Sequence, residues 1–287
     1  MGRGKTRLLK KKITSITATS HITRAMEMVA RARFNKIQKY ALAFRPYAEK
    51  YEEMAKDVLS DISGIEDVLL NPTEGKKVGI FLITGDMGLC GSYNTNVVQL
   101  VENQISKLGH NFAGLVVVGT KGTSYFKYHN VKIMKSYVRE YNYPNINIAH
   151  AIAEALIDII KEGTFDRVLA VYTNFKSMLA NLPKVEQFIP VPLGKRKEMR
   201  VWEYEFEPSS RELVSNFVPR YLAVKMCSML YEAKMSEFAA RQTAMRNATD
   251  NAMKMIKDLT LRYNKERQAY ITQEIIEITT SSEAINK

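Results

Sequence analysis

Two long stretches without glycine constrain the fold of this 287-residue chain more than any other feature. No glycine lies between Gly4 and Gly64, and none lies between Ser209 and Ser281. In both stretches apolar side chains recur at steps of three, four or seven residues, which is the pattern of a helix that pairs with another helix. A helix of this length needs a partner along its whole apolar stripe. We therefore expect the two stretches to pair as a long antiparallel coiled coil.

The apolar stripe predicts the buried seam of each helix. In the N-terminal helix the seam comprises Leu9, Ile13, Ile16, Thr23, Met26, Ala30, Ile37, Tyr40, Phe44, Tyr47, Tyr51, Met54 and Val58. In the C-terminal helix it comprises Phe217, Tyr221, Val224, Met235, Phe238, Gln242, Met245, Ala252, Ile256, Leu259 and Tyr263. Pro46 predicts a kink or a local break, because proline removes a helical hydrogen bond. Between Arg241 and Asn251 most residues are small or polar. Such a surface allows several different neighbouring chains to approach this part of the helix closely.

The middle of the chain has a different pattern. Short apolar runs at 77–84, 112–119, 131–138, 167–173 and 185–191 predict strands, and 93–108 and 146–162 predict helices, the latter with Asn147 as a possible cap. Alternation of strands and helices indicates a Rossmann-like α/β domain with a mostly parallel sheet. Residues 194–200 are expected to form a polar loop. The predicted domains are therefore 1–62, 75–205 and 209–287, the first and last forming the coiled coil.

Positive charge is concentrated near the N-terminus. The net charge is +12, and residues 1–45 contain twelve Lys and Arg residues against the single acid Glu27, which gives 12 − 1 = +11. The rest of the chain carries +1. Such a segment suits an acidic partner: nucleic acid, anionic lipid or an acidic protein surface. The simpler interpretation is a solvated helix face.

The sequence offers little for catalysis or for a cofactor. The loop Gly85–Gly91 (GDMGLCG) follows a strand and precedes a helix, but its glycine spacing does not match a dinucleotide fingerprint, and no G-K-[ST] completes a phosphate-binding loop. Cys90 is better explained as a small buried residue than as a nucleophile. The four histidines are scattered, so we expect no metal site and no cofactor. No run of about 20 apolar residues predicts a membrane-spanning helix, and no apolar segment follows the basic N-terminus as in a secretory signal.

Four motifs carry a resemblance to a known family. Residues 22–30 (ITRAMEMVA), 85–94 (GDMGLCGSYN), 236–241 with 248–252 (SEFAAR, ATDNA), and 263–278 (YNKERQAYITQEIIEI) occur in the order found in the γ subunit of F-type ATP synthase, which the whole chain resembles. Three positions differ from the family pattern. Ser281 and Ser282 stand where Gly-Ala is usual, and Met87 stands where Arg is common.

The resemblance implies a non-catalytic central rotor shaft. Such a subunit transmits rotation of the membrane c-ring to a hexamer of α and β subunits, so that proton or sodium flow drives ATP synthesis on β. The implied partners are α, β, ε and the c-ring, with no nucleic acid and no transmembrane segment. The implied location is the cytoplasmic face of the bacterial cell membrane, where the subunit is peripheral. The expected partner-contact residues are Met26, Arg24, Arg31, Arg267, Gln268, Thr272 and Glu274, with residues 22–30 and 267–274 near each other and near β.

Two other functions remain open from the residues alone. A basic nucleic-acid-binding protein would use the N-terminal helix, although aromatic residues are not interleaved with its basic cluster before Phe34. A nucleotide-dependent enzyme would use the central domain.

Overall fold

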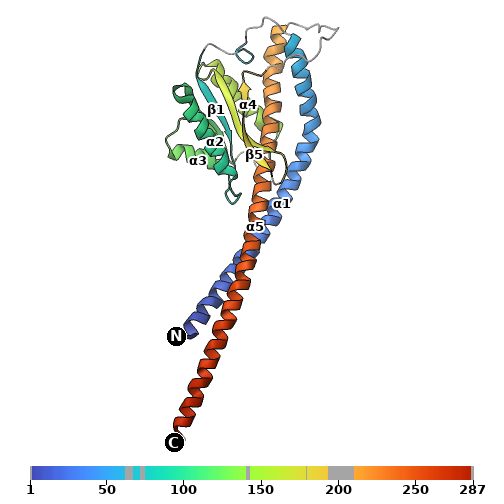
Figure 1. The fold of residues 1–287 in the computed structure, drawn as a ribbon. Coiled ribbons are helices and arrows are strands. Elements are labelled where there is room, and N and C mark those ends of the chain that lie inside the picture. The colour runs from blue at the N-terminus through green and yellow to red at the C-terminus, as the bar shows by residue number, and fades with distance from the viewer. Residues whose placement is uncertain are drawn as a thin grey trace. The chain divides into compact units, whose positions relative to one another are not determined.

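The computed structural model describes residues 2–61, 67–71, 75–139, 143–178, 180–192 and 210–285. Helix α1 (Gly2–Asp61) contains 60 residues and helix α5 (Ser210–Ile285) contains 76, so both predicted long helices are confirmed (Figure 1). The chain divides into two compact units. Unit 1 contains Met1–Ala30 and Gln242–Lys287, and unit 2 contains Arg31–Arg241. The predicted polar loop at 194–200 lies outside the described residues.

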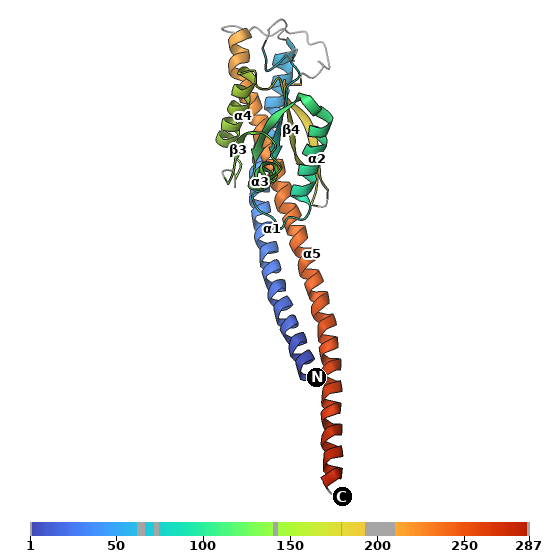
Figure 2. The same ribbon diagram turned by 90° about the vertical axis from the view of Figure 1, so that its left-hand side faces the viewer.

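In unit 1 the first part of α1 and the last part of α5 run side by side in opposite directions (Figures 1 and 2). The hydroxyls of Thr23 and Thr249 lie 2.8 Å apart and form a hydrogen bond between the helices. The residues buried along this contact are small or unbranched: Ser20, Ala30, Met245, Thr249 and Ala252. Small side chains permit close approach of two helices, and flexible methionine fills the remaining gaps. The predicted antiparallel pairing is confirmed within this unit.

Unit 2 contains a five-stranded sheet with the order β3-β2-β1-β4-β5. The strands are β1 (Val78–Ile83), β2 (Phe112–Val118), β3 (Ile133–Tyr137), β4 (Arg167–Phe175) and β5 (Asn181–Ile189). The first four are parallel, and β5 pairs antiparallel with β4. Between them lie α2 (Tyr93–Leu108), the 3₁₀ turn η1 (Gly109–Asn111), α3 (Thr120–Tyr128) and α4 (Ile146–Lys161). The predicted mostly parallel α/β sheet is confirmed.

Each face of the sheet packs in its own apolar layer. Alternate side chains of β1 point to opposite faces, as in any strand. Ile80 and Leu82 join the cluster that contains Val97 of α2 and Phe126 of α3. Phe81 and Ile83 join the larger cluster, in which α1, α4 and α5 cover this face of the sheet with side chains that include Ile37, Ile152, Leu156, Leu222, Met226 and Leu230.

Helix α5 is buried on nearly all sides within unit 2. Most residues between Tyr221 and Arg241 are buried, because α5 packs against α1 on one side and against the sheet on another. A helix that is enclosed all round carries no single apolar stripe. All eleven predicted seam residues of α5 are buried or half-buried.

The structure corrects several details of the sequence analysis. Helix α3 was not predicted, and β5 begins earlier than expected. Of the two outcomes predicted for Pro46, the local break is excluded, because α1 continues through it. The cap of α4 is Asn145 rather than Asn147, because the Asn145 side chain accepts a hydrogen bond of 3.0 Å from the backbone N–H of Ile148.

The predicted seam of α1 is wrong at three positions. Tyr40, Tyr47 and Met54 are 44%, 51% and 43% exposed, whereas the unpredicted Phe34, Ala55 and Leu59 are buried. A strict seven-residue repeat drifts around a straight helix of 3.6 residues per turn, so the buried face moves away from it. Phe34 also leaves the coiled-coil pattern to contact Phe175 of β4, with ring centroids 5.5 Å apart.

The carboxyl of the half-buried Glu232 on α5 predicts that the stability of unit 2 depends on pH. Burial raises the pKa of its carboxyl above the usual value of 4.5, although Lys184 and Arg45 act in the opposite direction. The folded protein therefore retains this proton to a higher pH than the unfolded chain does, and stability falls as pH rises above about 4.5.

We expect Glu232→Gln to raise the free energy of unfolding at pH 8, and expect this gain to shrink as pH falls toward 5. Urea unfolding of the full chain across this range measures the effect. Glu154→Gln, on the exposed face of α4, supplies the background. A gain that does not change with pH would contradict the assignment.

Candidate functional site

The loop that follows β1 begins with an anchored residue. Thr84 donates its backbone N–H to the carbonyl oxygen of Val118 at 2.8 Å, and its hydroxyl oxygen accepts the N–H of Gly122 at 3.0 Å. These bonds hold the end of β1 against the start of α3.

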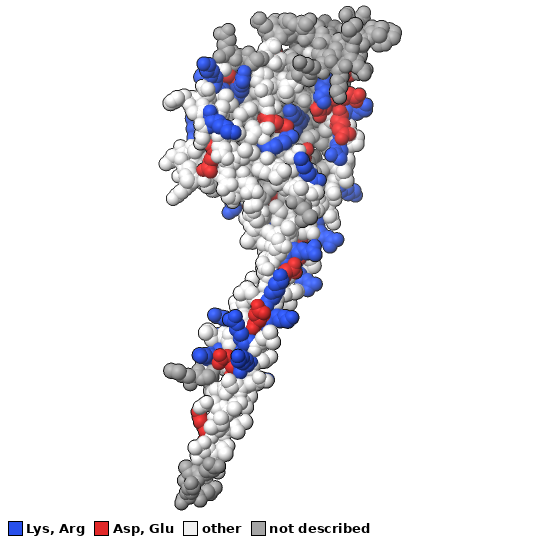
Figure 3. Space-filling view, viewed as in Figure 1, with Lys and Arg blue, Asp and Glu red and all other residues white. Residues whose placement is uncertain are grey.

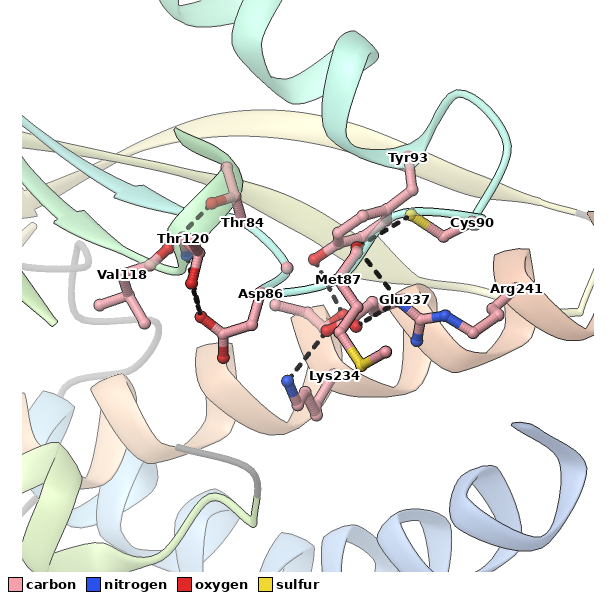
Figure 4. Close-up of polar contacts among 12 residues, drawn as sticks. Thr84, Asp86, Met87, Cys90, Tyr93, Val118, Thr120, Lys234, Glu237 and Arg241 are labelled. Atoms are coloured by element: carbon pink, nitrogen blue, oxygen red, sulfur yellow. Dashed lines mark hydrogen bonds and ion pairs between the residues drawn. The ribbon is translucent and has the colours of Figure 1, made fainter. Parts of the chain in front are cut away.

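Asp86 occupies the N-terminus of α3. Its Oδ1 accepts hydrogen bonds from the backbone N–H of Thr120 at 2.9 Å and from the Thr120 hydroxyl at 2.7 Å (Figure 4). It also accepts the backbone N–H of Arg139 at 3.2 Å. The N-terminus of a helix can bind an anion such as a phosphate. At α3, which follows β2, a carboxylate of the chain itself takes that place. The turn that would carry a dinucleotide fingerprint is a different one, between β1 and α2.

The same loop docks on α5 through Arg241. The Arg241 guanidinium donates from Nη2 to the carbonyl oxygens of Met87 and Gly88, at 3.2 and 3.3 Å, and from Nε to that of Gly88 at 3.3 Å. At the other end of the loop, the Tyr93 hydroxyl donates to the carbonyl oxygen of Ala233 at 3.0 Å. Figure 4 shows the two contacts converging on one stretch of α5.

A buried carboxylate holds Arg241 in place. Glu237 Oε1 lies 2.8 Å from Arg241 Nη2, and its Oε2 lies 2.9 Å from Lys234 Nζ. The exposed fractions of these side chains are 3% for Glu237 and Lys234 and 8% for Arg241. Both cations also lie near the Phe238 ring, at 5.7 Å for Lys234 and 5.3 Å for Arg241. This cluster, the Arg241 latch (Lys234, Glu237, Arg241), ties the α/β domain to α5 within unit 2.

The two cysteines are buried. The Cys90 thiol accepts a hydrogen bond of 3.2 Å from the Asn94 side-chain amide, and burial raises its pKa despite the nearby Arg241. Burial raises the pKa of Cys227 to about 12. Neither environment favours a thiolate, so the prediction that Cys90 is a small buried residue is confirmed. Within the described part of the chain, no three His, Cys, Asp or Glu side chains are placed to hold a metal ion.

The predicted contact residues lie on the two long helices. Arg24, Arg31, Arg267, Gln268 and Thr272 are exposed, and Met26 and Glu274 are half-buried. Glu274 accepts a hydrogen bond of 3.0 Å from the Tyr270 hydroxyl. Arg31 belongs to unit 2, and the others belong to unit 1.

The structure does not bring the two predicted stretches together. Because Thr23 faces Thr249 in an antiparallel pair, Met26 lies level with residues near 246, and Arg267 lies level with the first turns of α1. At 1.5 Å per residue the separation of Met26 from residues 267–274 is about 30 Å or more along the helix axis. The predicted contact residues of unit 1 therefore fall in two separate stretches rather than in one.

The last turns of α5 have an apolar surface without cations. Ile271, Ile275, Ile276 and Ile278 are 44%, 58%, 56% and 66% exposed. No Lys or Arg occurs between residues 268 and 286. In Figure 3 the corresponding end of unit 1 is mostly white, whereas the paired part carries many blue and several red side chains. We call the described residues 268–282 the apolar tip.

The Arg241 latch is the feature that sequence reasoning missed. Its residues are spaced three and four apart in a stretch of otherwise apolar or small residues, so their charges share one face of a helix. That spacing in a predicted buried helix indicates an internal ion pair. The carbonyl partners in the 85–91 loop could not be found from the sequence.

Comparisons with known proteins all point to one family. A family model described as ATP synthase matches residues 5–285. The chain is 40% identical to the ATP synthase gamma chain of Moorella thermoacetica over 277 residues, which is 96% of this chain and 98% of the relative. It is 37% identical to that of Brevibacillus brevis over 280 residues, with 97% and 98% covered.

Solved structures share the fold. The central stalk and c-ring structure of the Tetrahymena thermophila mitochondrial ATP synthase contains a chain 26% identical to this one. Its TM-score is 0.61, with 79% of this chain and 99% of that chain covered. A chain of the Euglena gracilis mitochondrial ATP synthase is 18% identical and has a TM-score of 0.73, with 98% and 95% covered.

Proposed function

This chain belongs to the ATP synthase gamma chain family, and on that premise we propose that it acts on its neighbours through two separate regions of unit 1. The subunit is the non-catalytic central shaft of the rotary enzyme. It transmits rotation of the membrane ring to the catalytic hexamer, and ATP is made on the β subunits. The hypothesis that the central domain is a nucleotide-dependent enzyme is therefore wrong.

The first contact region surrounds Met26. Arg24 lies beside it on α1 and is exposed. Arg31, also exposed, belongs to unit 2 and remains a separate proposed contact residue. Exposed cations form weak ion pairs that exchange readily, which suits a surface that must meet three equivalent β subunits in turn. Residues 1–45 carry a net charge of +11, which suits contact with an acidic surface on a neighbouring subunit.

The second contact region lies about 30 Å further along unit 1, at Arg267, Gln268, Thr272 and Glu274, and leads into the apolar tip. An apolar surface makes non-directional contacts, so it does not stabilise one rotational position of the shaft more than the others. The observation that carries this proposal is the end of the cations on α5 at Arg267, beyond which four isoleucines are exposed.

The partners of this chain are the α and β subunits of the catalytic hexamer, the ε subunit and the c-ring. We place the assembled protein peripherally at the cytoplasmic face of a bacterial cell membrane, because the relatives named above at 37–40% identity are bacterial. No helix in the described part of the chain is long and apolar enough to cross a bilayer. Recovery of the chain from washed membranes with both hexamer subunits tests this placement; recovery without them would contradict it. For this function we keep the division into segments 1–62, 75–205 and 209–287 as a proposal.

We expect Met26→Lys to leave assembly intact and to impair coupling. A new cation at this half-buried position would hold an acidic surface of β through an extra ion pair during rotation. Proton pumping per ATP hydrolysed, measured in membrane vesicles, should fall. Met28→Lys is the matched control, because Met28 lies on the same helix and is 61% exposed. An unchanged ratio for Met26→Lys, or an equal loss for Met28→Lys, would refute the role of Met26.

A further inference from the structure

A second basic surface lies in the α/β domain. Between residues 103 and 139 the sequence contains Lys107, Lys121, Lys127, Lys132, Lys135 and Arg139 and no Asp or Glu. Residues 46–287 as a whole carry only +1, because acidic residues elsewhere in the chain balance these cations. Five of the six cations lie on or beside α3 and β3, and all five are exposed. We call this the α3–β3 surface (Lys121, Lys127, Lys132, Lys135, Arg139).

Two carboxylates that the structure describes beside this surface are already engaged. Asp86 accepts hydrogen bonds from Thr120 and Arg139, as described above. Glu102 of α2 accepts a hydrogen bond of 2.7 Å from the Tyr125 hydroxyl. Counting these two, the described residues of the surface carry 5 − 2 = +3. This net positive charge suits an acidic partner.

Strand β3 is an open edge of the sheet. It pairs only with β2 in the strand order, and its residues Met134, Lys135 and Ser136 are all exposed. The carbonyl oxygen of Tyr137 accepts the N–H of Gly119, so the Tyr137 backbone faces inward. Because successive residues of a strand turn their backbone groups to opposite sides, the N–H and C=O of Ser136 face outward. Within the described ranges no strand lies on that side of β3, so these groups face outward from the sheet.

We propose that β3 binds an acidic extended segment of a partner protein, which adds a sixth strand to the sheet. Main-chain hydrogen bonds from the edge would supply affinity, and pockets or charges beside alternate residues would supply selectivity. Lys132 and Lys135 flank the open backbone groups and favour carboxylates on the added strand. The same lysines discourage pairing between two copies of this chain, which is a common use of lysine on edge strands.

The geometry favours an extended peptide over other anionic partners. A nucleic acid would need aromatic rings as a stacking platform. Tyr128 is exposed here, but its ring lies edge-on to His129 at 5.3 Å, and Tyr125 packs against Phe126 and His129. An anionic lipid surface would form ion pairs with the lysines, but it would offer no strand to pair with the outward N–H and C=O of Ser136. The α3–β3 surface belongs to unit 2, and the proposal for it does not depend on the two contact regions proposed for unit 1.

The test uses the full chain and a fluorescent decapeptide that alternates glutamate and valine. Fluorescence anisotropy should show saturable binding, and hydrogen exchange at the Ser136 amide should slow when the peptide is added. The double variant Lys132→Glu/Lys135→Glu should weaken binding by roughly tenfold or more, equivalent to about 1.4 kcal/mol. Lys107→Glu/Lys161→Glu makes the same change in net charge away from β3, and it should have a much smaller effect.

Two further probes separate strand addition from simple charge attraction. A peptide of equal charge with proline in place of valine loses the N–H of every second residue, and the proline rings fix φ away from the values of a paired strand. It should bind at least several-fold more weakly. Equal binding of the proline peptide would overturn the proposal. So would a response to a uridine RNA oligomer, or to vesicles containing phosphatidylserine, that depends on Lys132 and Lys135 while the acidic peptide does not bind.

Discussion

Replacing Glu237 by leucine should destabilise unit 2 by about 3–5 kcal/mol, because it leaves two buried cations without their shared carboxylate. Lys234 loses its 2.9 Å carboxylate partner, and Arg241 keeps the carbonyl oxygens of the 85–91 loop and the Phe238 ring but no carboxylate of the latch. Neither cation can reach water without movement of α5, since their side chains are 3% and 8% exposed. Urea unfolding of the purified chain measures the loss.

The chain contains a matched control for this change. Arg45 and Glu49 form an ion pair with the same spacing on α1, but both side chains are 69% exposed, and they lie 3.5 Å apart. Glu49→Leu should therefore change the free energy of unfolding by only about 0–1 kcal/mol. Similar small losses for the two variants would show that the Arg241 latch does not support the fold. Faster hydrogen exchange in the loop of the Glu237 variant would show that the latch also orders that loop.

Replacing Gly119 by alanine should cost about 3 kcal/mol or more, from backbone strain and overpacking together. Gly119 has a φ of +101°, which side-chain-bearing residues rarely adopt. An added Cβ would also meet the carbonyl group of Thr84, at 2.7 Å from its carbon. Because that carbonyl belongs to the backbone at the end of β1, it cannot turn aside as a flexible side chain can. Thermal unfolding of the variant measures this cost.

Gly163→Ala separates the two contributions. Gly163 also has a positive φ, +70°, but an added Cβ would find no atom within 4 Å. Its cost should be limited to the left-handed backbone penalty of about 1–2 kcal/mol. A loss at Gly119 no larger than the loss at Gly163 would contradict the predicted collision with Thr84.

Periodicity made the large elements predictable. A helix turns every 3.6 residues and a strand every two, so glycine-free apolar stripes and short apolar runs reveal them without knowledge of the fold. Helix α2 was predicted with the bounds that the structure shows, and the four parallel strands were located within a few residues. Helix α3 was missed because it has only nine residues, contains Gly122 and begins directly after Gly119. Its glycines pointed to a loop.

The candidate site was less accessible from the sequence. Motif resemblance indicated Met26 and Arg267–Glu274, but it also implied that these stretches adjoin. The bond between Thr23 and Thr249 fixes a register that separates them. Register depends on which small side chains permit close helix approach, and several registers satisfy the same apolar stripe.

The sequence by itself determined that two long helices pair and that an α/β domain lies between them in the chain, because local periodicity and the absence of glycine permit little else. Its motifs also pointed to the family. Only the tertiary structure decided which side chains meet: Arg241 with the carbonyl oxygens of Met87 and Gly88, Asp86 with the start of α3, and an open β3 edge beside five cations. Such contacts join residues up to 154 positions apart. Spacing along a chain carries no direct information about them, since they depend on how whole elements pack.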